Sequence, residues 1–177
     1  MNRRTTLTLT TMALLCITVA LPSGDAAAQQ KSLKDQLVGT WTLVSLQVTP
    51  ATGVTGPTIG YLGANPKGIV ILDVGGRYAW VAGRPDRPKF QGGGPLRTTT
   101  PDAEWGAASK AFNADFGNWS VNEADKIITW KKEMALVPND VGTEYKESII
   151  SLAGDELKTV VTLPSGAKFA WVYRRAK

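Results

Sequence analysis

The sequence has 177 residues, a formal net charge of +5, one cysteine and no histidine. Without histidine, Ser–His–Asp and Cys–His catalytic sites are excluded, and the commonest ligand of zinc, copper and iron is missing. Basic residues are scattered among acidic ones rather than clustered, so we expect no nucleic-acid partner. The residues predict neither a metal site nor a cofactor.

The first 28 residues have the pattern of a secretory signal peptide. Arg3 and Arg4 precede an apolar run at residues 12–21, and three alanines follow at residues 26–28. This order of charge, apolar run and small-residue cleavage site predicts cleavage after Ala28. The apolar run is too short to span a bilayer. The alternative is an N-terminal anchor that is retained.

Residues 29–177 are expected to form one domain, because their length is typical of a single core and no linker divides them. The single cysteine, Cys16, would leave with the signal peptide, so we expect no disulfide. We predict an exported protein, periplasmic or extracellular, with no transmembrane segment after cleavage.

The chain begins with a short helical turn at residues 31–37, in which Ser32 is the expected N-cap. Strand patterns follow, with alternating or continuous apolar residues separated by turn residues. The expected strands are residues 38–48, 68–74, 77–84, 118–122, 126–136, 143–152, 156–163 and 167–175.

Residues 102–116 are expected to form the main helix. Trp105, Ala108, Phe112 and Phe116 would then form one apolar stripe, which we expect to pack against the core. Residues 50–66 and 85–101 are rich in Gly and Pro and are expected to be loops.

The strand pattern predicts an all-β fold, an eight-stranded antiparallel up-and-down barrel with one α-helix and a long loop at its mouth. Most connections between the expected strands are short, and Gly75 and Gly76 are typical of a hairpin turn. Eight strands enclose space for packed side chains or for one small ligand. The sequence leaves open whether the barrel is filled or hollow.

Four motifs carry a resemblance to a known family. They lie at residues 37–45 (Leu-Val-Gly-Thr-Trp-Thr-Leu-Val-Ser), 84–90, 116–121 and 138–143. Together they resemble the bacterial lipocalin-like domain family. A lipocalin-type barrel usually carries a small apolar molecule, so the resemblance implies a small apolar or amphipathic ligand, while most members of this family have no assigned activity. Members commonly have histidine where this chain has Trp130 and Lys131, so no family ligand is carried over.

The resemblance also implies how one end of the barrel is closed. In lipocalin barrels a first-strand tryptophan that follows a glycine is covered by an arginine of the last strand, which here implies Gly39 and Trp41. Arg174 and Arg175 both lie in the last strand and point to opposite faces. Strand parity alone does not choose between them.

Aromatic residues on the strands are the candidates for a ligand site, since apolar walls with few polar groups are typical of small-molecule pockets. The candidates are Tyr78, Trp80, Trp130, Tyr145, Trp171 and Tyr173. Arg84 is added, because the guanidinium groups of Arg84 and Arg87 in the long loop are suited to grip a carboxylate or phosphate at the mouth. Alternatively, Arg84, Asp86 and Arg87 pair with one another and pin the loop, which is the interpretation we favour.

No spacing demands catalysis, so no catalytic residue is assigned. Glu133, Glu147, Tyr145 and Lys132 are loose candidates, for which solvated strand charges are the favoured interpretation. We expect an exported protein that binds a small, partly apolar molecule inside its barrel. One alternative is a cofactor-free lyase, isomerase or cyclase using a carboxylate and a tyrosine. Another is a filled barrel that acts through its surface.

Overall fold

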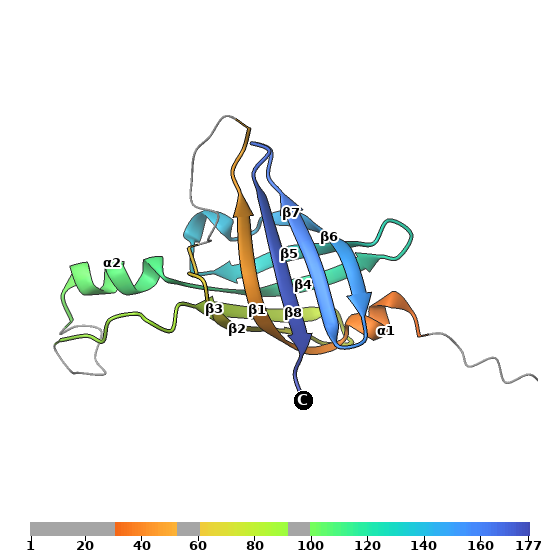
Figure 1. The fold of residues 1–177 in the computed structure, drawn as a ribbon, viewed down its shortest axis with the longest axis horizontal. Helices are drawn as coiled ribbons and strands as arrows, with labels where there is room; N and C mark the ends of the chain where they lie inside the picture. The colour runs from red at the N-terminus through yellow and green to blue at the C-terminus, as the bar shows by residue number, and fades with distance from the viewer. Residues whose placement is uncertain (1–30, 53–60, 92–99) are drawn as a thin grey trace, which may run out of the picture. The chain divides into compact units, whose positions relative to one another are not determined.

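Eight antiparallel strands form a closed barrel in the computed structural model, and β8 pairs with β1 to complete the ring (Figure 1). The structure describes residues 31–52, 61–91 and 100–177. The expected signal peptide and parts of both expected loops lie outside these residues. The predicted all-β, up-and-down antiparallel barrel is confirmed.

The strands follow the chain order, and each pairs with the strand before and after it. Their bounds are β1 Gly39–Thr49, β2 Lys67–Leu72, β3 Arg77–Gly83, β4 Phe112–Asn122, β5 Ile127–Ala135, β6 Glu144–Ala153, β7 Glu156–Thr162 and β8 Lys168–Arg175. A short 3-10 helix, η1 (Pro138–Asp140), connects β5 to β6. All strands except β4 lie within two residues of their expected bounds.

The expected helix at residues 102–116 is too long. The observed helix α2 is Asp102–Lys110, and the chain continues from Phe112 as β4, paired with β3. Phe112 and Phe116 are four residues apart, a spacing that places them on one face of a helix and also on one face of a strand. No residue of α2 is buried, so the expected core stripe is wrong as well. No helix in the described ranges is long and apolar enough to cross a membrane.

A bulge in β1 changes which of its residues face inward. The register with β8 shifts between Leu43 and Ser45, so that Leu46 is buried together with Trp41 and Leu43, whereas Gln47 is exposed. Strict alternation would have placed Gln47 on the Trp41 face. One extra residue reverses the facing of all later residues in a strand.

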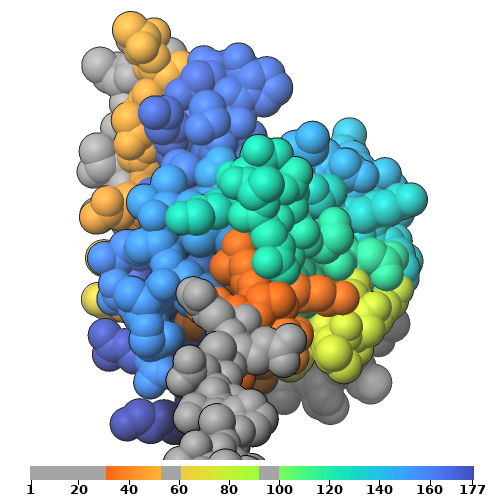
Figure 2. All heavy atoms as spheres, turned by 90° about the vertical axis from the view of Figure 1, so that its right-hand side faces the viewer, coloured from red at the N-terminus to blue at the C-terminus, as the bar shows by residue number. Residues whose placement is uncertain are grey.

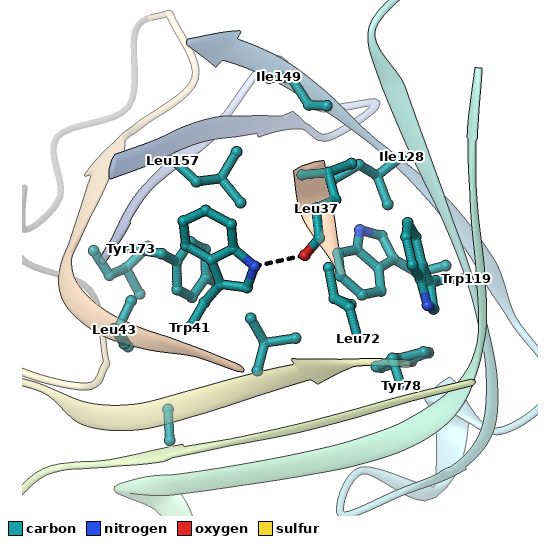
Figure 3. Packing of buried hydrophobic residues seen from close by; sticks show 14 of the residues in the cluster. Leu37, Trp41, Leu43, Leu72, Tyr78, Trp119, Ile128, Ile149, Leu157 and Tyr173 are labelled. Atoms are coloured by element: carbon teal, nitrogen blue, oxygen red, sulfur yellow. Dashed lines mark hydrogen bonds between the residues drawn. The ribbon is translucent and has the colours of Figure 1, made fainter. Parts of the chain in front are cut away.

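Helix α1 (Leu33–Leu37) closes one end of the barrel. The Ser32 side chain accepts a hydrogen bond from the Asp35 backbone N–H, which caps the helix as expected. Figure 2 shows α1, in orange, in the middle of this end. Leu37 is fully buried and its carbonyl accepts a hydrogen bond from the Trp41 indole N–H at 2.7 Å (Figure 3). Helix and first strand are thus joined through the core.

Arg175 lies over Trp41, with its guanidinium carbon 4.1 Å from the ring centroid. The same guanidinium donates hydrogen bonds to the backbone carbonyls of Val38 and Gln36. Arg174 is exposed, so the structure places Arg175 and not Arg174 at the barrel closure. Gly39 has a φ of 127°, and a Cβ there would lie 2.9 Å from Arg175 Nη1. Glycine therefore lets this guanidinium approach the backbone.

Candidate functional site

The half of the barrel away from α1 contains a cavity of about 330 Å³. Its lining includes Tyr61, Asp140, Thr143 and Leu163, which lie in the connections between strands at that end. The remaining lining residues are Trp80, Asn113, Asp115, Trp130, Lys132, Tyr145, Glu147, Val161, Phe169, Trp171 and Tyr173. The barrel is therefore filled at its closed end and hollow at its open end.

Two groups of aromatic rings form the apolar walls. On β3 and β8, Trp80 packs edge-on against Trp171 at a centroid distance of 5.6 Å, and Trp171 stacks with Tyr173 at 6.3 Å. On β5 and β6, Trp130 stacks with Tyr145 at 6.2 Å. The alternation of each strand turns these side chains inward. The contacts between rings hold the walls in place.

Glu147 is a buried carboxyl group in the cavity lining, with 3% of its surface exposed. The Thr159 hydroxyl donates a hydrogen bond to its Oε1. Burial raises the pKa of Glu147 from 4.5 to about 7, although hydrogen bonding from Thr159 opposes that shift. The Trp130 indole N–H also lowers this pKa, although it forms no hydrogen bond of normal geometry. Near neutral pH, Glu147 is therefore a mixture of acid and carboxylate.

A second polar group at the cavity centres on Lys132. Its ammonium lies 2.7 Å from Asp140 Oδ2 and 3.6 Å from Asp115 Oδ2. Asp115 also accepts a hydrogen bond from the Tyr78 hydroxyl at 2.7 Å. Burial raises the pKa of Asp115, while Tyr78 and Lys132 lower it. One ammonium is thus shared by two carboxylates.

The hydroxyl groups of two tyrosines differ in their hydrogen bonds. The Tyr173 hydroxyl accepts a bond from the Trp80 indole N–H at 3.3 Å, which leaves its own proton unused. No described residue hydrogen-bonds the Tyr145 hydroxyl. Burial raises the pKa of both tyrosines well above the usual value, and the charge of Glu147 raises it further. Both therefore stay protonated and can donate to a ligand.

Of the seven expected ligand-site residues, five line the cavity: Trp80, Trp130, Tyr145, Trp171 and Tyr173. Tyr78 does not line it. Its ring packs behind the wall, edge-on to Trp130 at 4.8 Å, and its hydroxyl fixes Asp115.

Arg84 is also outside the cavity lining. Its guanidinium pairs with Asp86 at 2.7 Å, and the Arg87 side chain donates to the Arg84 carbonyl. This is the favoured alternative, in which these residues pin the loop. The position of Arg84 does not support a role in binding an anion at the mouth.

The four loose catalytic candidates separate into two groups. Glu147, Tyr145 and Lys132 line the cavity, so solvated strand charge is a wrong description of these three. Glu133 lies on the outer surface, paired with Arg77 and Asn118. No group of three acidic side chains in the described part of the chain could hold a metal ion.

Sequence reasoning missed several cavity residues, chiefly Asp115. It fell within the expected helix, whereas β4 turns it inward between β3 and β5. The sequence did hold one signal. Asp115 lies two positions from Gly117 and four from Trp119, and the alternation of a strand places these three buried residues on one face. Asp140 and Thr143 come from the turn after β5, and nothing in their spacing reveals an inward position.

Comparison with known proteins agrees with this geometry. A family model described as a lipocalin-like domain matches residues 38–168, which run from the end of α1 to the first residue of β8. No curated protein matches the chain. The match covers most of the sequence and nearly all of the barrel, so the resemblance stated from the motifs is confirmed. The chain belongs to the lipocalin-like domain family.

Proposed function

We propose that this protein is an exported binding protein that holds one small, partly apolar molecule inside its barrel. The observation that carries the proposal is the cavity of about 330 Å³ with aromatic walls and a few polar groups. Pockets of this size and lining are typical of small-molecule sites. An entirely filled barrel, one of the alternatives from the sequence, does not describe the open half.

The ligand is expected to enter at the end opposite α1. Leu37 and Trp41 are fully buried and fill the interior of the barrel at its closed end. At the open end, Tyr61 is 43% exposed and Leu163 is 40% exposed, and both line the cavity. These two residues mark the mouth of the site.

Binding can be tested with a neutral apolar fluorescent dye, N-phenyl-1-naphthylamine. We expect the wild-type protein to bind it and Val161→Trp to bind it at least about tenfold more weakly, because the indole occupies cavity space. Val44→Trp is the matched control, since Val44 is 43% exposed on β1 and outside the cavity. Dye binding that is absent, or equal in both variants, would overturn the proposal.

Export is a separate part of the proposal and rests on the signal-peptide pattern of residues 1–28. Expression of the whole chain in a Gram-negative host, followed by fractionation and intact-mass measurement, tests it. We expect a periplasmic or extracellular species that begins at Gln29. A full-length species in the cytoplasmic fraction would contradict export and leave ligand binding unaffected.

A second candidate function is cofactor-free proton-transfer catalysis, as in a lyase, isomerase or cyclase. One observation favours it: Glu147, whose pKa is raised to about 7, and Tyr145 line the same cavity. A carboxyl group that titrates near the working pH is suited to general acid–base chemistry. The test is deuterium uptake from D₂O into carbon positions of any molecule that co-purifies. Uptake with wild type but not Glu147→Gln would support catalysis.

A further inference from the structure

We propose that the molecule held in the cavity is an organic ammonium compound and that Glu147 is its counter-ion. This inference rests on the proposed binding function and names the chemical class of its ligand. Three features carry it: the charge balance of the cavity, the missing partner of Glu147 and the arrangement of the aromatic walls.

Acidic groups outnumber basic groups in the lining. Asp115, Asp140 and Glu147 face one ammonium group, that of Lys132. Lys132 is already held between Asp140 and Asp115, at 2.7 Å and 3.6 Å. With Glu147 ionised, the described lining therefore carries an excess of negative charge. Such a field opposes an anionic ligand and favours a cation.

Glu147 is the acidic group without a basic partner. No lysine or arginine in the described ranges forms an ion pair with it, and among the described residues its hydrogen-bond donor is the Thr159 hydroxyl. A carboxylate buried to this extent is normally paired with a positive charge. The structure thus holds a built anionic site, opening on the cavity, for which the described side chains offer no counter-ion.

The aromatic walls suit a cation because the faces of indole and phenol rings attract positive charge. The lining contains three tryptophans, and one cation of the protein already makes this contact: Lys132 Nζ lies 5.2 Å from the Tyr145 ring centroid. Trp80 and Trp171 stand edge-to-face on the opposite wall. The charged group of an amine could therefore contact ring faces and Glu147, and its apolar part could pack against the aromatic walls.

Ligand charge and the proton of Glu147 are then linked. Below about pH 7 the carboxyl group holds its proton, which a cationic ligand has to displace. The ionisable groups whose charges interact with Glu147 come from three strands and are Asp115 on β4, Tyr145 on β6 and Tyr173 on β8. Lys132 on β5 and Asp140 in η1 share the cavity without contacting Glu147. Affinity for a cation should rise between pH 6 and pH 8.

Three probes with one ring system separate charge from shape: tryptamine is cationic, tryptophol is neutral and indole-3-acetate is anionic. Isothermal titration of the wild-type protein at pH 8 should give tryptamine an affinity at least about tenfold above that of tryptophol. From pH 8 to pH 6, tryptamine should weaken about tenfold and release a proton, seen as a heat that depends on the buffer. Tryptophol should bind equally at both pH values.

Glu147→Gln should abolish the preference for tryptamine and its pH dependence, and an unchanged near-ultraviolet circular dichroism spectrum shows that the fold is intact. Glu144→Gln makes the same chemical change at an exposed position of the same strand and should keep both. Equal binding of the three probes, a preference for indole-3-acetate, or dye binding without tryptamine binding would overturn the cation assignment alone. Failure of the dye as well would overturn the proposed binding function.

Discussion

The two halves of this barrel use the same strands for opposite purposes. In the closed half, β8 contributes Arg175, which covers Trp41 and bonds to the backbone next to α1. In the open half, the same strand contributes Trp171 and Phe169 to the wall of a cavity. The closed half is densely packed, whereas in the open half no described side chain forms an ion pair with the buried carboxyl group of Glu147. The difference separates residues that stabilise the fold from residues that line the cavity.

The largest expected effect is at the centre of the closed half. Trp41→Ala removes a fully buried indole and its hydrogen bond to Leu37, and should lower the free energy of unfolding by about 3–5 kcal/mol. Chemical denaturation followed by circular dichroism measures this. A loss below about 1 kcal/mol would contradict the view that the closed half carries the stability.

At the open half, Glu147 should cost stability where its carboxyl group has to ionise. The group has a pKa of 4.5 when unfolded and about 7 when folded, so this cost is absent below pH 4.5, grows up to pH 7 and then stays constant. Glu147→Gln should therefore be more stable than wild type by about 3 kcal/mol above pH 7 and similar to it at pH 4.

Denaturant unfolding from pH 4 to pH 8 measures that difference, with Glu144→Gln as the control. The control should follow the wild-type curve at every pH. If Glu147→Gln stabilises the protein equally at pH 4 and pH 8, the titration of Glu147 is not the cause of the stability difference.

The closure arginines offer a matched pair in one strand. Arg175→Ala should lower the free energy of unfolding by about 2 kcal/mol, because it removes two charge-assisted hydrogen bonds and the contact with Trp41. Arg174→Ala should change it by less than about 0.5 kcal/mol, since that side chain is exposed. Thermal unfolding of both variants is sufficient, and equal losses would refute the assignment.

The smallest expected effect is on affinity. Trp171→Ala should weaken the neutral dye about tenfold, because it removes a large face of the cavity wall. Arg84→Ala should leave dye affinity unchanged, since its guanidinium pairs with Asp86 outside the cavity lining. Fluorescence titration of both variants measures this. Loss of affinity in Arg84→Ala would instead give the loop a role at the mouth.

The barrel could be predicted because its strands have short connections and clear alternation. The main error concerned Phe112 and Phe116, whose spacing fits both a helix and a strand. Only pairing with β3 decides between the two, and pairing depends on residues far away in the sequence. The bulge in β1 was equally invisible, because no local residue requires it.

The candidate site was predictable in its aromatic walls, whereas of its polar residues only Lys132, Tyr145 and Glu147 were named, and as loose catalytic candidates. The shared face of Trp171, Tyr173 and Arg175 follows from strand parity, but parity alone did not choose Arg175 over Arg174 for the barrel closure. The raised pKa of Glu147 could not be predicted, because burial depends on how all eight strands enclose it. A cavity is likewise a property of the whole barrel and not of any segment.

The pairing of β1 with β8 has a consequence for how the chain acquires its structure. All other strand pairs join strands that follow one another along the chain, whereas this pair joins the first and the last strand of the domain. Closing so long a loop costs conformational entropy before the pairing compensates for it. The ring is therefore expected to close last, and synthesis has to reach β8 before Trp41 meets Arg175.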